Sequence, residues 1–462
     1  MQNFIFIERV DPKKRNVVER LKDFREIYEL FQPNEASNQS ERCIQCGDPY
    51  CHSRCPLHNY IPQWLKSVAE KDLQLAFNLS NEPSPFPEIM GRICPHDRLC
   101  EGACTLNEGY GAVTIGPIET FINEEGFKAG LKPTFATKKI GKKVAIVGSG
   151  PAGLSAATYL LRAGIDVEIF ERSDRPGGLM TYGIPGFKLD KNVVFRRVKW
   201  MEEAGLKIHY GVEVGKNKPF DELTENFDAV FIGVGATKQR KPGIPNENAT
   251  GCLMAMDLLV NVQRKQFGDE YDRSIDVKDR NVVVIGGGDT AMDCVRTSLR
   301  EEARSVVCAY RRDARNMPGS RKEYNNAKEE GIEFIFNAAP KQVLVNEKGE
   351  VIGVEMLKTS LGEADESGRQ RLKIIKGSEF RVSADVVIFA LGFDPVPFEF
   401  LSANGIQTND WGGIVIDEHY ETTTRGVYAG GDCSRGADLV VTAAFDGREA
   451  AKSIIKRLTQ EI

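Results

Sequence analysis

Residues 142–172 read KKVAIVGSGPAGLSAATYLLRAGIDVEIFER, and this stretch decides the fold. An apolar run is followed by three closely spaced glycines, then by helix-forming residues and a second apolar run. That order predicts a buried strand, a glycine-rich turn, a helix and a parallel strand, which together make the βαβ unit of dinucleotide-binding folds. The sequence therefore predicts an α/β protein.

The glycines of this turn have separate physical tasks. We expect Gly148 to permit the tight turn, Gly150 to let the backbone approach a pyrophosphate, and Gly153 to let helix and strand pack closely. The pyrophosphate would then lie at the helix N-terminus, where free N–H groups favour negative charge. Glu171 ends the second strand and could accept hydrogen bonds from an adenine-ribose hydroxyl. A helix start unrelated to nucleotide binding is the alternative.

A second unit, RNVVVIGGGDTAMDCVRTSLREEARSVVCAYRR, covers residues 280–312 and repeats the plan. Its turn is Gly286-x-Gly288-x-x-Ala291, and its second strand leads into Arg311 and Arg312 where the first unit has a carboxylate. A guanidinium can grip a 2′-phosphate with two hydrogen bonds, whereas a carboxylate repels it. We therefore predict NADPH rather than NADH here. A solvated strand end is the alternative for the arginine pair.

The rest of the chain favours a flavin in the first unit. RPGGL (175–179) offers a loop beside an isoalloxazine, and TRGVYAGGD (424–432) ends a strand with a carboxylate that could bond the ribityl chain. We expect a last helix from Thr442, with its positive end toward the flavin. Facing flavin and nicotinamide sites form a hydride-transfer pair, whose chemistry belongs to the cofactors.

A third region, from about residue 382, contains the apolar runs ADVVIFALG, GGIVID and GVYAGGD but no βαβ start. We expect it to complete the first dinucleotide domain, which makes the second domain an insertion in the first. The predicted domains are 1–140, helical and metal-binding; 141–255 with 380–462, for FAD; and 256–379, for NADPH.

Seven of the eleven cysteines lie between residues 43 and 104. Their runs are C-x2-C-x4-C-x3-C-P from Cys43 and C-x5-C-x3-C from Cys94. The first run resembles the bacterial ferredoxin pattern, in which the fourth cysteine binds a different cluster from the other three. It predicts Cys43, Cys46 and Cys51 on one iron–sulfur cluster and Cys55 on a second.

Two four-iron clusters need eight ligands, so one ligand is missing or is not sulfur. Nearby oxygen and nitrogen candidates are His52, His58, His96, Asp97 and Glu119. Two zinc sites are the main alternative, because zinc is also held by four cysteines or by three with a histidine. A metal-free disulfide cluster is a second alternative.

Helical periodicity in the first 140 residues predicts an amphipathic helix over 16–32, ended by Pro33. Smaller helices are expected around 61–78 and 118–129, with no strand in this region. Cys294 falls on a predicted helix and Cys308 in an apolar strand, so both are expected in the core.

Length and composition limit the number of domains and the class of protein. The chain has 462 residues, 41% apolar and 27% charged, which is typical of a globular protein with two to four domains. Its net charge of -5 argues against a nucleic-acid surface. We find no basic signal-peptide region and no apolar run long enough for a membrane span, so we expect a cytoplasmic protein.

These motifs together resemble one family. The cysteine pattern, GSGPAGL (148–154), ERSDRPGGLMTYGIPGFKLD (171–190), IGGGDTAMDC (285–294), CAYRRDARNMPGSRKE (308–323) and AGGDCSRGADLVVTAAFDGREAA (429–451) are similar to the small (beta) subunit of NADPH-dependent glutamate synthase. The same module resembles the N-terminal part of dihydropyrimidine dehydrogenase. The resemblance implies a helical domain with two [4Fe-4S] clusters, followed by interleaved FAD and NADPH domains.

The resemblance also implies site residues. One cluster would be held by Cys43, Cys46, Cys51 and Cys104, and the other by Cys55, Cys94, Cys100 and Glu119, where the dehydrogenase has a glutamine. A solvated glutamate at a helix start is the alternative for Glu119. The implied nucleotide-binding residues are Gly148, Gly150, Pro151, Ala152, Gly153, Glu171, Arg172, Gly178, Leu179, Lys188, Gly431, Asp432, Thr442, Gly286, Gly288, Asp289, Thr290, Ala291, Arg311, Arg312 and Arg321.

By this resemblance the chain oxidises NADPH at FAD and sends single electrons through the clusters to a large subunit that makes glutamate from glutamine and 2-oxoglutarate. Hydride transfer needs no general base, and we assign no catalytic side chain. A stand-alone NADPH:ferredoxin oxidoreductase or a sulfide dehydrogenase subunit is the alternative. A scaffold with vestigial sites is a further one. A flavin disulfide reductase is disfavoured because no Cys-x-x-Cys follows residue 140.

Overall fold

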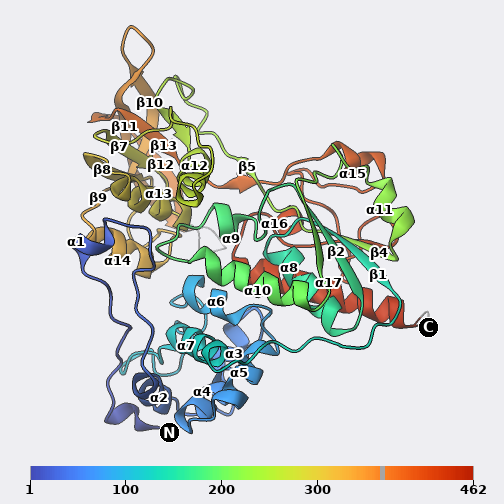
Figure 1. Ribbon diagram of the computed structural model, residues 1–462. Coiled ribbons are helices and arrows are strands. Elements are labelled where there is room, and N and C mark those ends of the chain that lie inside the picture. The colour runs from blue at the N-terminus through green and yellow to red at the C-terminus, as the bar shows by residue number, and fades with distance from the viewer. Residues whose placement is uncertain (1, 365–369, 461–462) are drawn as a thin grey trace.

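The computed structural model describes residues 2–364 and 370–460, and its first part is helical. In Figure 1 most helices of this part lie at the foot of the molecule, below the two sheet-containing parts, whereas α1 (Val17–Arg20) lies higher, beside α14 (Arg321–Glu329). The helices of this part are η1 (Asn3–Ile5), α1 (Val17–Arg20), α2 (Pro33–Glu41), α3 (Tyr50–Arg54), α4 (Ile61–Ala69), α5 (Leu73–Asn81), α6 (Pro87–Ile93) and α7 (Ile115–Lys128). All described residues from 33 to 140 lie outside strands, as predicted.

The expected helix over 16–32 is wrong, because only α1 forms. The segment folds back on itself instead: the Arg15 N–H donates to the Ile27 carbonyl at 2.9 Å, and the Glu29 N–H donates to the Lys13 carbonyl at 2.9 Å. A straight helix could not pair its own ends in this way. Pro33 begins α2 rather than ending a helix, because the first helical position needs no N–H donor.

The helix predicted around 61–78 is present as two helices. Lys71 has a left-handed φ of 63°, which ends α4, and the Asp72 side chain then caps α5 by accepting from the Leu75 N–H. α7 confirms the helix predicted near 118–129, beginning three residues earlier.

The first βαβ unit builds a five-stranded parallel sheet with the order β15-β4-β1-β2-β3. Its strands are β1 (Lys143–Val147), β2 (Asp166–Glu171), β3 (Lys207–Tyr210), β4 (Ala229–Ile232) and β15 (Val427–Ala429). The helices of this part are α8 (Pro151–Arg162), α9 (Leu179–Tyr182), α10 (Lys191–Glu203), α11 (Asp221–Asn226), α15 (Glu399–Ala403), α16 (Asp432–Arg435) and α17 (Val440–Gln460). β15 completes this sheet from the far end of the chain, as predicted.

The second unit builds another five-stranded sheet, with the order β6-β13-β7-β8-β9. Its strands are β6 (Cys252–Met254), β7 (Asn281–Ile285), β8 (Ser305–Tyr310), β9 (Glu333–Phe336) and β13 (Val386–Phe389). Its helices are α12 (Ala255–Phe267), α13 (Asp289–Arg300) and α14 (Arg321–Glu329). Cys294 on α13 and Cys308 on β8 are fully buried, as expected.

Two expectations for the region after residue 382 are wrong. β13 does not complete the first sheet, because it lies between β6 and β7 and pairs in parallel with both. GGIVID (412–417) makes only single bridges, through Ile414 and Ile416, and joins neither large sheet. An apolar run alone cannot choose between two sheets that both have buried strands.

The chain crosses between the two dinucleotide parts twice. β5 (Lys238–Gln239) lies on the outward crossing and pairs antiparallel with β14 (Phe393–Asp394) on the return. Figure 1 shows β5 between the two parts. This pairing explains how one domain is inserted in the other.

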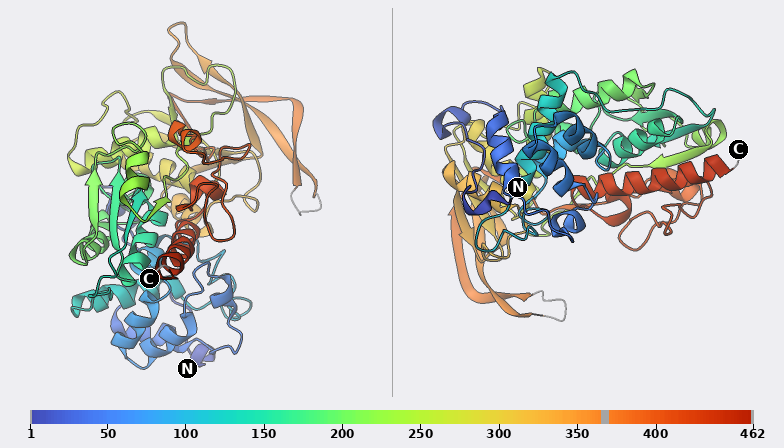
Figure 2. Two further views of the ribbon diagram at one scale, coloured as in Figure 1. Left: turned by 90° about the vertical axis from the view of Figure 1, so that its right-hand side faces the viewer. Right: turned by 90° about the horizontal axis from the view of Figure 1, so that it is seen from below.

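A third sheet, which sequence analysis did not predict, is antiparallel with the order β10-β11-β12. It comprises β10 (Ala338–Val345), β11 (Val351–Ala364) and β12 (Gln370–Ser383). The β11–β12 hairpin projects away from the body of the protein (Figure 2).

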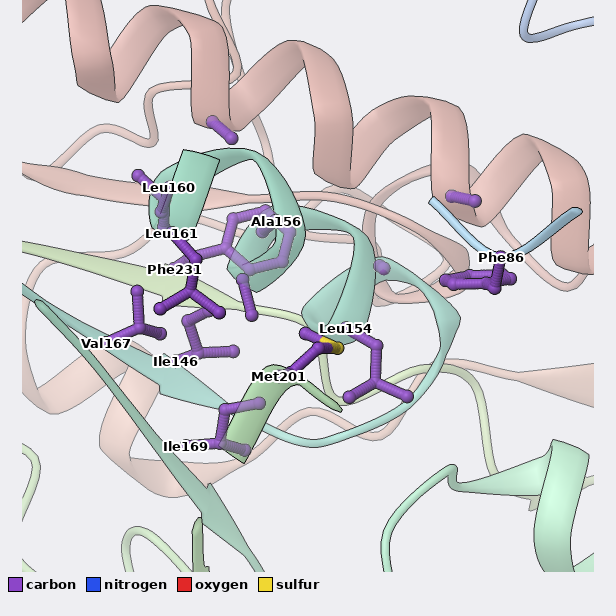
Figure 3. Packing of buried hydrophobic residues seen from close by; sticks show 14 of the residues in the cluster. Phe86, Ile146, Leu154, Ala156, Leu160, Leu161, Val167, Ile169, Met201 and Phe231 are labelled. Carbon is purple, nitrogen blue, oxygen red and sulfur yellow. The ribbon is translucent and has the colours of Figure 1, made fainter. Parts of the chain in front are cut away.

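The largest apolar core joins the helical part to the first sheet. Ile146, Val167 and Ile169 from the sheet pack with Leu160 of α8, and Phe86, which precedes α6, belongs to the same buried cluster. Figure 3 shows these side chains together. Because the two parts share one core, the position of the cysteine region is fixed relative to the first nucleotide turn. Among the described residues no helix is long and apolar enough to cross a membrane.

Candidate functional site

A cavity of about 720 Å³ lies where the three parts of the protein meet. The turn before α8 and the end of β2 line it from the first dinucleotide part, and the start of α13 lines it from the second. Residues 93–95 and 98 line it from the helical part. One cavity is therefore open to both nucleotide turns and to the cysteine region.

The first glycine turn has the geometry that its sequence requires. Gly148 has a φ of 95°, and a Cβ on Gly153 would lie 2.0 Å from the Gly148 carbonyl oxygen. Neither position can hold a side chain without a shift of the backbone. At Gly150 a Cβ would meet only the Gly233 carbonyl oxygen, at 3.9 Å, so this residue leaves open space beside the cavity. Pro151 and Ala152 line the same cavity at the start of α8.

Glu171 lies at the end of β2, buried, and lines the cavity together with Arg172. One carboxylate oxygen accepts from the Ser149 N–H at 2.8 Å, and the other accepts from the Ser173 N–H at 2.7 Å. These bonds fix the carboxylate beside the glycine turn, with remaining lone pairs available to a ligand hydroxyl.

The C-terminal part of the first fold supplies a second carboxylate. Asp432 begins α16 after Gly431 and lines the cavity, and its Oδ1 atom is buried without a hydrogen-bond partner. Burial raises the pKa of Asp432 to about 7. A buried carboxyl oxygen without a partner, on a residue that lines a cavity, fits a ligand with hydroxyl donors such as the ribityl chain of FAD.

The last helix begins at Val440, two residues before the position predicted for Thr442. The Thr442 hydroxyl donates to the Leu439 carbonyl at 2.8 Å, and Thr442 is outside the cavity lining although Val441 and Ala443 belong to it. Gly178 and Leu179 line the cavity from the loop and helix α9.

The second glycine turn faces the same cavity. A Cβ on Gly286 would lie 2.3 Å from the Ala390 carbonyl oxygen, whereas one on Gly288 would meet nothing within 4 Å. Asp289 and Thr290 line the cavity, and Ala291 is buried in the first turn of α13. The turn is thus open where a dinucleotide backbone would approach.

The three predicted phosphate-binding arginines lie away from the cavity lining. Arg311 and Arg312 follow the end of β8, and Arg311 is exposed. Arg321 opens α14 with its guanidinium 5.6 Å from the centre of the Tyr324 ring. This position at the end of β8 suits the adenosine end of a dinucleotide whose nicotinamide lies in the cavity.

Lys188 meets a residue that sequence analysis missed. Its Nζ donates to Asp293 Oδ1 at 2.9 Å, joining the first dinucleotide part to α13, and both residues line the cavity. Burial raises the pKa of Asp293 to about 6, although the Lys188 ammonium favours the charged carboxylate. The spacing of Asp289 and Asp293 places both on one helix face, a signal that could have identified Asp293.

The cysteines divide into two groups. The outer cysteine group consists of Cys43, Cys46, Cys51 and Cys104, which line one small cavity. Burial raises the pKa of Cys51 to about 12, and the neighbouring Cys43 and Cys104 contribute. Gln45 Nε2 donates to the Cys43 sulfur at 3.2 Å, and the Cys46 sulfur lies 3.3 Å from the Thr105 hydroxyl.

The inner cysteine group consists of Cys55, Cys94 and Cys100. Burial raises the pKa of the Cys94 thiol well above its usual value, and Glu119 and Cys55 raise it further. Glu119 lies on α7 with 6% of its surface exposed, and Asn59 Nδ2 donates to its Oε1 atom at 2.6 Å. Burial raises the pKa of Glu119 to about 8. The glutamate is therefore a buried neighbour of these three cysteines rather than a solvated helix-start residue.

The other predicted oxygen and nitrogen candidates make different contacts. Asp97 accepts from the Arg321 N–H at 3.1 Å, and His52 Nδ1 lies 3.1 Å from the Asn59 carbonyl oxygen. The centre of the His58 ring lies 5.4 Å from that of His52. His96 is buried, and its ring packs on the backbone of Gly116.

The donor sets fit two multi-iron clusters. Each group brings together four side chains that can bind iron once deprotonated, and in the described residues no three histidine, cysteine or acidic side chains converge as they would on one metal ion. The ligands of a four-iron cluster each bind a different iron and surround it. Cys94 also lines the nucleotide cavity, so the inner group directly adjoins that cavity.

Comparison with protein-family models gives two matches. Residues 20–131 match the model described as dihydropyrimidine dehydrogenase domain II, 4Fe-4S cluster. Residues 142–447 match the model described as pyridine nucleotide-disulphide oxidoreductase.

Among curated proteins, the chain is 47% identical to the glutamate synthase [NADPH] small chain of Escherichia coli K12 over 98% of both chains. It is 35% identical to the small chain of Bacillus subtilis over 98% and 97% of the two chains. It is also 46% identical to the putative oxidoreductase AegA of E. coli, covering 97% of this chain and 69% of that protein.

Solved structures share the fold of the dinucleotide parts. FprA of Mycobacterium tuberculosis in complex with NADPH gives a TM-score of 0.59 at 22% identity, covering 69% of this chain and 85% of that one. Thioredoxin reductase of T. acidophilum gives a TM-score of 0.51 at 23% identity, covering 69% of this chain and 99% of that one.

Proposed function

Because the chain belongs to the family of glutamate synthase NADPH small chains, we propose that it is the electron-input subunit of such an enzyme. It oxidises NADPH at FAD and passes the electrons through two [4Fe-4S] clusters to a large subunit. That subunit makes glutamate from glutamine and 2-oxoglutarate.

One observation carries this proposal: both nucleotide turns and Cys94 of the inner cysteine group line the same cavity. A hydride donor, a flavin and an iron–sulfur cluster need this proximity because electrons move between them over short distances. An arrangement with separate cavities would not support the proposal.

The residues have the following roles. The turn at Gly148–Gly153 and Asp432 hold FAD, the turn at Gly286–Ala291 and the arginines after β8 hold NADPH, and the two cysteine groups with Glu119 hold the clusters. Bound together, these groups supply hydride transfer from nicotinamide to flavin and one-electron transfer onward. The chain itself binds, orients and excludes water.

Lys188 and Asp293 contribute a fixed charge pair at the junction of the two dinucleotide parts. Their 2.9 Å bond spans the cavity wall and holds α13 against the flavin-binding part. The pair therefore helps to set the orientation of the two nucleotides. We assign it a positioning role and assign no general base.

The proposal includes a cytoplasmic location and a domain division. The helical domain is 1–140, and the FAD domain includes β15 and α17. Because β6 and β13 pair within the second sheet, we extend the limits of the NADPH domain outward from 256 and 379 to include Cys252 and Phe389.

A stand-alone NADPH oxidoreductase is the second candidate, and the 46% identity to AegA is the observation that favours it. The two candidates share every cofactor site and differ in the electron acceptor. They are therefore distinguished by partner and not by flavin chemistry.

The test uses the full chain purified without oxygen. We expect bound FAD, about eight irons per chain from two four-iron clusters, and bleaching of the flavin by NADPH. When a glutamate synthase large chain is added, NADPH oxidation should require both glutamine and 2-oxoglutarate. A protein that contains zinc and no iron would contradict the proposal. If the rate of NADPH oxidation does not depend on the large chain, and a ferredoxin is reduced instead, the second candidate is favoured.

A further inference from the structure

A buried arginine adjoins Cys43 of the outer cysteine group in the chain and has no acidic partner among the described residues. Arg42 follows α2, immediately before Cys43, and none of its surface is exposed. Its guanidinium donates to four backbone carbonyls, those of Ile7, Tyr110, Gly111 and Ala112, at 2.6 to 3.0 Å. Within the described residues no carboxylate forms an ion pair with it.

An isolated buried charge is costly, so a guanidinium at such a site normally has an anionic partner. Burial lowers the pKa of Arg42, and the nearby Arg9 lowers it further, whereas Cys104 favours the charged form. Arg9 is itself neutralised by Asp11 at 2.7 Å and Glu101 at 2.8 Å. Arg42 therefore adjoins the outer group through Cys43, its neighbour in the chain, and through Cys104, whose charged form favours the charged guanidinium.

Among the described residues, no arginine beside the inner cysteine group is both buried and without an acidic partner. Arg197 is paired with Glu88 at 2.5 Å. Arg448, whose charge favours the charged form of Cys55, is paired with Glu449 at 2.8 Å. Arg98, near Cys94, is 41% exposed in its side chain and pairs with Asp289. Exposed charges are screened by solvent and contribute little.

Both groups supply four anionic ligands, so their ligand charges are equal when Glu119 completes the inner set. Among the described residues, the difference is one cation without an acidic partner, Arg42, which adjoins the outer group. The side chain of Gln45 adds a hydrogen bond to the Cys43 sulfur on the same side. Net charge and hydrogen bonds to sulfur are among the factors that set cluster potentials.

We propose that Arg42 is the counter-charge of the outer cluster and makes that cluster the electron sink, so that electrons run from the inner cluster to the outer one. The inference rests on the proposed function. Reduction adds one negative charge to a cluster, and a buried cation stabilises that charge. In the transfer step the inner cluster loses one electron, the outer cluster gains it, and no proton or bond is exchanged.

This order of the two clusters agrees with the place where electrons enter the protein. Cys94 of the inner group lines the nucleotide cavity, where electrons arrive, whereas the outer group lines a separate small cavity and its Cys46 is partly exposed. An electron that enters beside the flavin therefore moves toward the surface. Arg42 acts through the cluster and is a positioning residue, not a catalytic one.

The test is a redox titration of the anaerobic holoprotein, followed by electron paramagnetic resonance. Cys46→Ser identifies the signal of the outer cluster. Arg42→Gln keeps amide donors for the carbonyls but removes the charge, and Arg42→Lys keeps the charge. We expect the wild-type outer cluster to be reduced first. Arg42→Gln should shift its reduced-to-oxidised ratio at least tenfold toward oxidised at a fixed potential, about 59 mV for one electron. Arg42→Lys should stay near wild type.

If Arg42→Gln fails to assemble, Gln45→Leu gives an independent test. It should lower the potential of the same signal by a smaller factor and leave the other signal unchanged. The inference is overturned if Arg42→Gln leaves the outer signal unshifted, if Arg42→Lys shifts it as far as Arg42→Gln, or if Gln45→Leu moves only the inner signal. A wild-type protein without reducible clusters would instead contradict the proposed function.

Discussion

At the residue scale, the first glycine turn needs residues without a side chain for two reasons, one for folding and one for ligand binding. Gly153 is required by the fold, because a Cβ would collide with the Gly148 carbonyl oxygen. Gly150 is not required by the fold, because its Cβ direction is open. The two positions therefore separate folding from ligand binding within one motif.

Gly150→Ala should fold normally and bind FAD more weakly, because the methyl group occupies the approach of the pyrophosphate. Gly153→Ala should destabilise the protein by about 1–3 kcal/mol, because α8 must move away from β1. Thermal unfolding of the FAD-free proteins and FAD titration measure the two effects separately. Wild-type FAD affinity in Gly150→Ala would contradict the role of this turn.

The arginines after β8 carry the second prediction at this scale. Replacing Arg311 and Arg312 by alanine should raise the KM for NADPH roughly 10- to 100-fold, because charge-assisted hydrogen bonds to the 2′-phosphate are worth about 1.5–3 kcal/mol. The KM for NADH should change little. Steady-state kinetics with both nucleotides provide the measurement, and an equal rise for both would exclude the phosphate role.

At the element scale, a buried charge network joins α13, α14 and the N-terminal segment. Glu330, which follows α14, receives hydrogen bonds from Arg296 and Arg300 at 2.8 to 3.1 Å and lies 3.0 Å from Arg20 Nε. Phe187 from the FAD-binding part covers the two α13 arginines, at 4.4 and 4.1 Å from its ring centre. Through Arg20, the network holds the short helix α1 against the end of α14.

This network predicts that the folded protein loses stability in acid. Burial alone would raise the pKa of Glu330, but Arg296 and Arg300 outweigh it and lower the pKa from 4.5 to about 2. A depressed carboxyl pKa gives stability that is present above pH 4.5 and is lost as the pH falls toward 2, on the order of 3 kcal/mol. Glu330→Gln should lower the apparent thermal midpoint at pH 7 and flatten its pH dependence between 4.5 and 2.

The matched control for that measurement is Glu347→Gln, an exposed glutamate in the turn between β10 and β11. It should leave both the midpoint and the pH dependence as in the wild type. Midpoints are compared as apparent values because a protein with several domains need not unfold in one step. The same pH dependence in Glu330→Gln and wild type would show that the network is not the source.

At the scale of the whole molecule, the shared core fixes one order of sites: nucleotide cavity, inner cysteine group, outer cysteine group. Phe86 and Leu57 of the helical part belong to the buried cluster of the first sheet. Arg448 of α17 donates to the Leu57 carbonyl at 2.8 Å. This bond connects α17 to the segment that follows Cys55 of the inner group. The position of the cysteine region is therefore a property of the assembled domains.

That order predicts different results for two cysteine variants. Cys94→Ser should let NADPH bleach the flavin but leave the outer cluster oxidised, because the inner cluster precedes it. Cys46→Ser should lose the outer cluster and still permit reduction of the inner one. Freeze-quench electron paramagnetic resonance after NADPH addition measures both. Rapid reduction of the outer cluster in Cys94→Ser would contradict the order of sites.

Local chemistry sets the limit of what could be predicted from the chain alone. The two glycine turns, the strand–turn–helix plan and the two cysteine runs are encoded by short spacings, because a turn or a ligand loop is built from neighbouring residues. The short helices α4, α5 and α7 are predicted by the same local periodicity. Lys71 shows the limit, since its left-handed turn divides one expected helix into two.

Contacts between distant residues were decided by tertiary structure. β13 joins the second sheet because its partners β6 and β7 are there. The sequence of Val386–Phe389 does not indicate which of the two sheets this strand joins. The N-terminal segment bends because Arg15 and Ile27 pair and because Arg20 meets Glu330, more than 300 residues away. The closeness of Cys94 to both nucleotide turns, the Lys188–Asp293 bond and the isolated charge of Arg42 likewise arise only when the parts pack, because free energies of burial and of charge depend on what surrounds a residue in space.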